Sequence, residues 1–230
     1  MRDPSPSRVA LPAAAPAGIE VWRLDLDLDA PLAAADWAVL DGSEQAQAAR
    51  LLRHHDRIRM VAARAALRRL LAERLHREPV GLRFVRTAEG KPELADRAVR
   101  FNISHAGACA LIALSPHGAV GVDIECCDTA LDVADLAWEA MSSAERAAFG
   151  RCRRGFFRCW AVKEAAAKAV GSGIDDGFLG LSALSAGSGG CWRMHHPDRD
   201  WSGVLAWELA APAGYVAAVA HANENFSQSW

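Results

Sequence analysis

Two short segments concentrate charged side chains that could bind a metal ion and a phosphate. In the apolar segment 121–125, Asp123 and Glu125 lie two residues apart, and on a strand they would point to the same face. In the segment 160–168, Glu164 and Lys168 lie one helical turn apart. Magnesium is a hard ion that takes a few carboxylates, water and substrate phosphates. Three carboxylates beside cationic side chains therefore predict a magnesium–phosphate site.

Each of these features also has a purely structural interpretation. Two acidic residues on one strand can simply face solvent, and Glu164 with Lys168 can be an ordinary helix-stabilising pair. The strand around Asp123 and Glu125 is otherwise apolar, and unpaired acids near a buried sheet would be costly. Metal binding is favoured over the structural interpretation only when all three carboxylates are counted together.

A third segment offers groups that could hold a phosphate by hydrogen bonds. An expected strand leads into a loop, and together they offer the side chains of Asn102, Ser104 and His105 and the backbone N–H groups around Gly107. Turn chemistry with a surface histidine is the alternative, and it is the better interpretation of a Ser-His pair taken alone. Lysine supplies a compact charge that arginine cannot imitate. The three lysines of the chain all fall in segments of interest: Lys91, Lys163 and Lys168.

Periodic patterns predict the elements that must position these groups. Strands are expected at 19–26, 82–86, 99–103, 110–114, 119–126, 181–184, 191–195, 204–209 and 215–220. Helices are expected at 32–40, from an N-cap at Ser43, and at 56–76, 131–141 and 153–170, with a capping box formed by Ser142 and Glu145. Each half then runs strand, helices, strands. We therefore predict a pseudo-duplicated α+β protein: a disordered tail at 1–18, subdomains at 19–118 and 119–222, and a loose tail at 223–230.

Composition excludes several classes of protein. The chain has 230 residues, a net charge of −2 and no apolar run long enough to span a membrane. It shows no secretory signal, no dinucleotide or Walker phosphate loop, and no zinc-finger or RNA-binding signature. Its six cysteines are scattered without a CxxC pair, which fits a reducing cytoplasm. Neither a membrane nor a nucleic acid is expected as a partner.

Charge is unevenly distributed along the chain. Residues 50–77 contain nine arginines against Asp56 and Glu73, whereas residues 120–150 contain seven acids against one arginine. The basic stretch could meet an anionic ligand or an acidic partner protein. A solvated helix face is the alternative, and it is favoured for that stretch considered alone.

Taken together, four motifs in order resemble the Sfp-type 4′-phosphopantetheinyl transferases over residues 19–220. They are Gly90-Lys91-Pro92, Phe101-Asn102-Ile103-Ser104-His105, Gly121-Val122-Asp123-Ile124-Glu125, and the stretch from Trp160 to Lys168 that runs into Gly171-Ser172-Gly173. The resemblance implies a pseudo-two-fold α+β fold with the active site between its halves, in a cytoplasmic monomer that imitates a dimer.

The reaction implied by the resemblance is a magnesium-dependent transfer of phosphopantetheine. The donor is coenzyme A, the acceptor is a serine of an acyl or peptidyl carrier protein, and adenosine 3′,5′-bisphosphate is released. The resemblance assigns the metal to Asp123, Glu125 and Glu164. Glu164, directly or through water, would be the base for the serine, and Lys168 would stabilise or protonate the leaving group.

Coenzyme A contacts are also implied by the resemblance, with one departure. Lys91, Ser104, His105 and Lys163 are the expected contacts. Members of the family often place lysines before the first long helix to hold the 3′-phosphate, but Glu44 and Gln47 occupy that stretch here. Arginines nearby are the candidate substitutes, and Arg59 is the one we favour: Arg50, Arg53, Arg57 and Arg59.

Two other functions stay open at this point. One is a magnesium-dependent nucleotide phosphodiesterase or pyrophosphatase that uses no protein acceptor. The other is a non-catalytic module that binds a carrier protein. For a transferase, the carrier is expected to dock near residues 151–158 or on the basic first long helix, because carrier proteins are generally acidic. Fatty-acid, polyketide and nonribosomal peptide pathways are not distinguished.

Overall fold

The computed structural model describes residues 5–128, 131–149, 152–172, 180–185 and 190–223. Two antiparallel sheets form its centre, and each is made from strands of one half of the sequence. In sheet order, the first contains β1 (Ser7–Val9), β2 (Glu20–Asp25), β6 (Cys109–Ser115) and β5 (Arg100–Ala106). The second contains β7 (Ala119–Cys126), β11 (Tyr215–Ala222), β10 (Val204–Leu209), β9 (Cys191–His195) and β8 (Ser182–Ser185).

In each half, helices follow the opening strands. They come after β2 in the first half and after β7 in the second half. The first half contains α1 (Ala34–Ala38), α2 (Gly42–Ala49), α3 (His54–Leu75), a 3-10 turn (Pro79–Gly81) and a small hairpin of β3 (Phe84–Arg86) and β4 (Pro92–Leu94). The second half contains α4 (Val133–Ala140), α5 (Ser143–Phe149) and α6 (Arg153–Val170). The order of strand, helices and strands thus occurs twice, and the expected duplicated α+β fold is confirmed.

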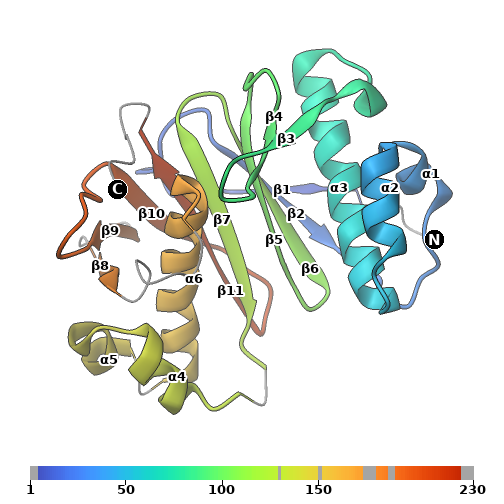
Figure 1. Cartoon of the computed structure of the whole chain (residues 1–230). Helices are drawn as coiled ribbons and strands as arrows, with labels where there is room; N and C mark the ends of the chain where they lie inside the picture. Colours follow the sequence, from blue (N-terminus) through green and yellow to red (C-terminus); the bar gives the residue numbers. More distant parts are fainter. Residues whose placement is uncertain (1–4, 129–130, 150–151, 173–179, 186–189, 224–230) are drawn as a thin grey trace.

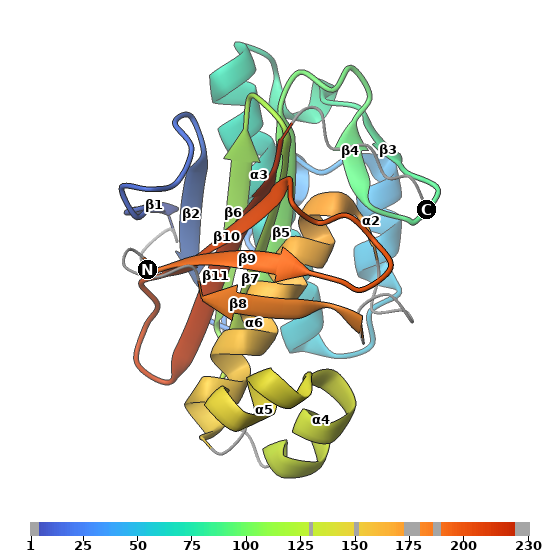
Figure 2. The same cartoon turned by 90° about the vertical axis from the view of Figure 1, so that its left-hand side faces the viewer.

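The two halves pack as layers, with the sheets facing each other and a long helix on each outer side (Figures 1 and 2). Each sheet is therefore covered on both faces, by a helix on one side and by the other sheet on the other. Because side chains alternate along a strand, neighbouring residues contact different layers. On β6, Ile112 packs toward α3 and Leu111 packs toward the second sheet. On β7, Val122 and Ile124 pack toward the first sheet, so the other face of β7 meets α6. Burial on both faces explains why β6 and β7 are nearly continuous apolar runs.

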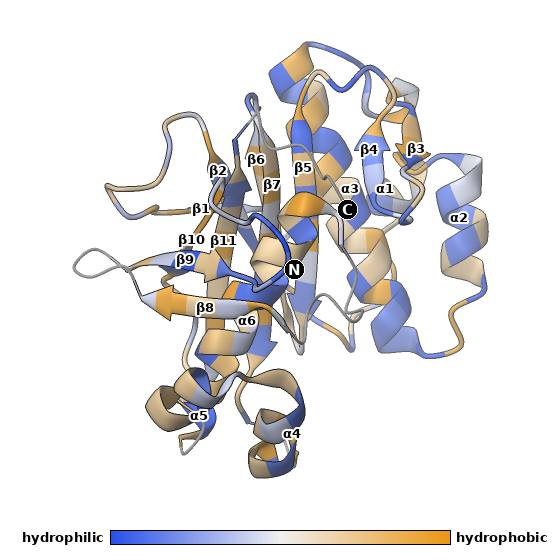
Figure 3. Ribbon diagram, turned by 60° about the vertical axis from the view of Figure 1, so that its left-hand side comes forward, coloured by the Kyte–Doolittle hydropathy of each residue, from blue (hydrophilic) through white to orange (hydrophobic). Residues whose placement is uncertain are grey.

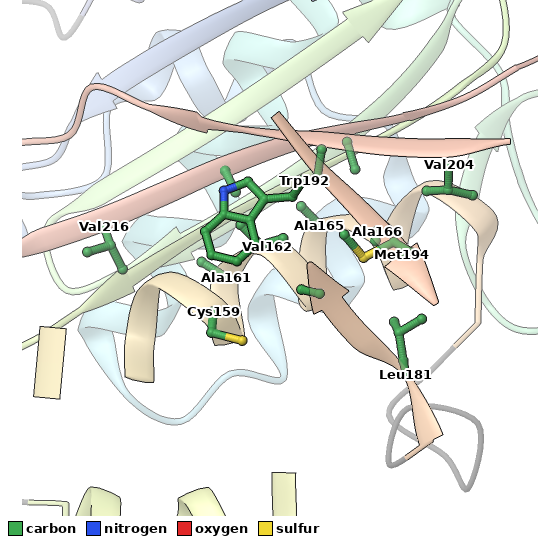
Figure 4. Close-up of a cluster of buried hydrophobic side chains, with 14 of the residues drawn as sticks. Cys159, Ala161, Val162, Ala165, Ala166, Leu181, Trp192, Met194, Val204 and Val216 are labelled. Carbon is green, nitrogen blue, oxygen red and sulfur yellow. The ribbon is translucent and has the colours of Figure 1, made fainter. Parts of the chain in front are cut away.

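The outer core of the second half lies between α6 and its sheet (Figure 4). Trp192 of β9 and Val216 of β11 pack against Ala161, Val162 and Ala165 of the helix. Alanines on this helix face let the backbone of α6 approach the sheet closely. Hydrophilic residues lie instead on surface elements such as α2 (Figure 3).

Helix starts follow side-chain caps, with one correction. The capping box of Ser142 and Glu145 is confirmed, since each side chain bonds the backbone N–H of the other residue. The N-cap of α2 is Asp41, not Ser43 as expected, because the Asp41 carboxylate accepts from the N–H groups of Ser43 and Glu44. Several cap-forming residues stand together there, and the sequence alone does not choose among them.

The chain ends differ in part from expectation. A disordered tail at 1–18 is wrong for residues 7–9, which form β1 and pair with β2. Val9 and Leu11 pack on the cluster between the sheets, which supplies the apolar burial that holds this segment. Of the expected loose end at 223–230, residues 224–230 lie outside the described residues. No helix in the described part of the chain is long and apolar enough to cross a membrane.

Candidate active site

Strand geometry places two carboxylates against α6. Because Val122 and Ile124 face the first sheet, Asp123 and Glu125 face the opposite side of β7. Helix α6 packs on that side, and its residues Glu164 and Lys168 lie on the same helix face. The arrangement expected from the spacing of these four residues is therefore present.

Gly121 makes this close packing possible. A Cβ atom at this position would lie 2.0 Å from the carbonyl oxygen of Ala165 and 2.4 Å from the backbone nitrogen of Ala169. Real Cβ atoms do not approach backbone atoms so closely, so any other residue would push α6 away from β7. The glycine two residues before Asp123 thus sets the distance between the strand carboxylates and the helix charges.

Lys168 links the charged side chains of the site. Its Nζ atom lies 2.5 Å from Asp123 Oδ1, 3.2 Å from Ser104 Oγ and 3.9 Å from Glu164 Oε2. Ser104 Oγ also donates to Asp123 Oδ1 at 2.8 Å. Since Ser104 belongs to the first sheet, the site is assembled from both halves of the chain.

Burial makes the three carboxyl groups hard to ionise. Desolvation is the main cause that raises the pKa of Asp123, and Lys168 opposes it. Desolvation also raises the pKa of Glu164 and of Glu125, each to about 7, with a further contribution from the charge of Asp123. Trp160 Nε1 donates to Glu125 Oε1 at 3.1 Å and orients that carboxylate. The sequence pointed to Trp160 only as the start of a motif and not as a partner of Glu125.

The carboxylates are chemically suited to a divalent cation. Asp123 Oδ2 and Glu164 Oε1 are buried and have no hydrogen-bond partner among the described residues. A hard cation would satisfy both oxygens and relieve the repulsion among the acids. Within the same part of the chain, no three His, Cys, Asp or Glu side chains are already grouped as a metal centre. Because magnesium usually keeps water and substrate phosphates as ligands, an incomplete set of protein ligands is compatible with it.

His105 and Arg59 extend the site toward α3. Arg59 Nε donates to the carbonyl of Gly107 at 2.7 Å, and its Nη1 pairs with Asp56 at 2.8 Å. The imidazole of His105 is exposed, yet the surrounding protein desolvates it enough to lower its pKa, and Arg59 and Lys168 lower it further. Cationic side chains from α3 and α6 thus lie around His105 of β5, beside the carboxylates.

Lys91 precedes β4, and its side chain lies at the C-terminal end of α6. Its Nζ donates to the carbonyl oxygens of Lys168 at 2.5 Å, Ala169 at 2.9 Å and Val120 at 3.3 Å. A cation at the C-terminal end of a helix is favourable because the last carbonyls have no partner within the helix. In this structure Lys91 therefore joins the β3–β4 hairpin to α6 with all three of its N–H bonds.

Lys163 lies apart from the group of carboxylates, although it precedes Glu164. The side chain is 1% exposed, its Nζ donates to the Ala140 carbonyl at 2.6 Å, and Glu145 is 3.5 Å away. Glu145 Oε1 also accepts from Ala183 N at 2.6 Å. A side chain closed to solvent cannot reach a ligand, so the expected coenzyme A contact of Lys163 is corrected to a buried ion pair that ties α6 to α4, α5 and β8.

Comparisons with known proteins match both halves of the chain. Residues 32–117 match the N-terminal 4′-phosphopantetheinyl transferase family, and residues 119–220 match the 4′-phosphopantetheinyl transferase superfamily. A Synechocystis protein named as a 4′-phosphopantetheinyl transferase is 37% identical over 158 residues, which cover 65% of this chain and 64% of that protein.

Two further relatives carry the same kind of name. The 4′-phosphopantetheinyl transferase HetI of Nostoc is 32% identical over 165 residues, covering 68% of this chain and 70% of that protein. A phosphopantetheinyl transferase of Thraustochytrium is 31% identical over 187 residues, covering 71% of this chain and 64% of that protein. The match thus spans about two thirds of each relative. The chain belongs to the 4′-phosphopantetheinyl transferase superfamily.

Proposed function

We propose that this protein transfers 4′-phosphopantetheine from coenzyme A to a serine hydroxyl of an apo carrier protein. The observation that supports this function best is the group of Asp123, Glu125, Glu164 and Lys168, brought together at the junction of two halves that both match the family. The bond that forms joins the serine oxygen to the phosphorus of phosphopantetheine. The bond that breaks joins that phosphorus to the bridging oxygen, and adenosine 3′,5′-bisphosphate leaves.

Asp123, Glu125 and Glu164 would hold a magnesium ion together with the pyrophosphate of coenzyme A. When bound, the ion would offset the negative charge of the phosphates and of the buried carboxylates. The unpartnered oxygens Asp123 Oδ2 and Glu164 Oε1 support this assignment.

Glu164 is proposed as the base that accepts the serine proton, directly or through one water. In the metal-free protein, burial raises the pKa of Glu164 to about 7. A carboxylate can act as a base when it lies within hydrogen-bond reach of the proton, directly or through one water. Lys168 would stabilise or protonate the leaving bisphosphate from the same helix face. Phosphoryl transfer depends mainly on positioning and charge neutralisation, and these two side chains supply both.

His105, Ser104 and Arg59 are proposed to contact the phosphates of coenzyme A. Their support is the cationic environment that Arg59 and Lys168 create around the exposed His105 ring. Lys91 is left out of this set because its Nζ is bonded to three backbone carbonyls.

Intact-protein mass spectrometry of apo carrier proteins tests the proposal. Each carrier is incubated with this protein, coenzyme A and magnesium, in parallel with EDTA, the Glu164→Gln variant and a control variant, Glu73→Gln. Glu73 is an exposed residue of α3. A phosphopantetheine mass gain that is lost with EDTA and with Glu164→Gln, but retained with Glu73→Gln, is the expected result. Coenzyme A cleavage without carrier modification would instead indicate a hydrolase, and coenzyme A binding without turnover would indicate a binding module.

A further inference from the structure

The tip of the β5–β6 hairpin is held from both halves of the molecule. Strand β5 ends one residue after His105, and Gly107 follows with a φ angle of +51°. From the first half, Arg59 donates to the Gly107 carbonyl at 2.7 Å. From the second half, the Tyr215 phenol oxygen accepts a hydrogen bond from the Ala108 N–H at 3.2 Å. The residue proposed to contact coenzyme A is therefore next to a turn that is fixed on two sides.

Tyr215 lies in direct contact with this turn. A Cβ atom on Gly107 would lie 2.3 Å from the Tyr215 phenol oxygen, so the ring is seated against the turn backbone. Tyr215 is the only tyrosine of the chain, and it opens β11 opposite Cys126, next to the pair formed by Val216 and Glu125. The residue that holds the hairpin tip thus belongs to the strand beside a proposed metal ligand.

Among the described residues, four hydrogen bonds join the hairpin to the second half, and the Tyr215 bond is the outermost. Asn102 Oδ1 accepts from Val122 N at 2.9 Å, and Ser104 Oγ donates to Asp123 at 2.8 Å. Lys168 Nζ donates to Ser104 Oγ at 3.2 Å. These three bonds fix the buried part of β5. His105 lies beyond them, with its ring exposed, and the nearest bond between the halves on its far side is the one to Tyr215.

We propose that Tyr215 is a positioning residue that holds the hairpin tip so that His105 faces the phosphates of coenzyme A beside Lys168. This inference rests on the proposed function, because coenzyme A is the ligand that His105 would contact. The phenol acts through the backbone of the turn and touches no reacting atom. Its loss should weaken coenzyme A binding and leave the chemistry at Glu164 and Lys168 in place.

Tyr215→Phe keeps the ring and removes only the phenol hydroxyl, whose oxygen accepts the bond from Ala108 N–H. We expect the KM and the calorimetric Kd for coenzyme A to rise roughly three- to tenfold, with kcat changed less than about twofold, which is the scale of one partly exposed hydrogen bond. Amide exchange at Ala108 should accelerate roughly five- to tenfold. His221→Ala is the matched control, since it removes a 2.8 Å bond to the His117 carbonyl near the other end of β11. This control should change neither the Kd for coenzyme A nor the amide exchange at Ala108.

A double-mutant cycle tests whether Tyr215 acts through His105. If it does, Tyr215→Phe with His105→Ala should bind coenzyme A no more weakly than His105→Ala alone. Additive losses, or an unchanged Kd in Tyr215→Phe, would overturn the inference while the wild type still bound coenzyme A. Absence of coenzyme A binding by the wild type would overturn the proposed function itself, and unchanged Ala108 exchange would show that Tyr215 does not hold the turn.

Discussion

At the scale of single residues, the site depends on glycine at position 121, because no Cβ atom fits between β7 and α6 there. We predict that Gly121→Ala destabilises the protein by about 3 kcal/mol, because its Cβ would meet the α6 backbone at 2.0 Å and overpacking typically costs this much. The same displacement would separate Asp123 from Lys168, so transferase activity should fall more than stability explains. Urea unfolding and carrier-modification rates measure the two effects.

Gly42→Ala is the control for the conformational effect of replacing a glycine. Gly42 opens α2 and has no heavy atom within 4 Å of the Cβ position, so alanine should be neutral or slightly stabilising there. If the two variants unfolded at the same urea concentration, close packing of α6 on β7 would not be the reason for glycine at position 121.

At the scale of elements, sequence periodicity was sufficient to locate β7 and α6 and to turn Asp123 and Glu125 toward Glu164. The alternation of period two decides the face of a strand once its other face is apolar. The lysines were less predictable because α6 is buried on several sides. Position 163 could point to the site or to Glu145, and only the packing of α4 and α5 decides between them. Strand β1 was missed because its pairing with β2 is a long-range contact that leaves no local pattern.

Lys91 connects the β3–β4 hairpin to α6, and its titration should make the free energy of unfolding depend on pH. Burial lowers its pKa to about 8 in the folded protein, whereas the pKa of an unfolded lysine is about 10.4. Between these values the unfolded chain binds more protons, so the contribution of Lys91 to the free energy of unfolding rises with pH. Below the folded pKa the full cost of burying the cation is present, and it is relieved as pH increases through this window.

The measurement compares wild type with Lys91→Met in urea at pH 7.5 and pH 10. Methionine keeps the apolar stem and removes the titrating group. Relative to the variant, the wild type should gain about 2 kcal/mol between these pH values, which is most of the free energy equivalent to the pKa shift. Groups that titrate in both proteins cancel in the difference. A difference between the two proteins that does not vary with pH would mean that Lys91 keeps an ordinary pKa.

At the scale of the whole molecule, we propose that the arginines at the start of α6 form a docking surface for an acidic carrier protein. Arg153 and Arg154 are exposed, and Arg158, further along the helix, donates to both oxygens of Glu208 at 2.9 and 2.7 Å. The helix that begins with these arginines continues through Trp160 to Glu164 of the candidate site. We propose that a carrier docked at its start presents its serine to that site.

Reversing these charges should therefore weaken binding of the carrier protein without destabilising the fold. We predict that Arg153→Glu with Arg154→Glu raises the KM for carrier roughly three- to tenfold, most strongly at low salt, because the steering of an acidic partner is lost. Acidic residues in the first turn favour a helix, so stability should be retained. Arg83→Glu, on the exposed surface before β3, is the control and should leave this KM unchanged. Steady-state transfer rates at several salt concentrations, with coenzyme A binding measured in parallel, decide the matter. An unchanged KM for the carrier would mean that the docking surface lies elsewhere. The basic face of α3 would then be the next surface to test.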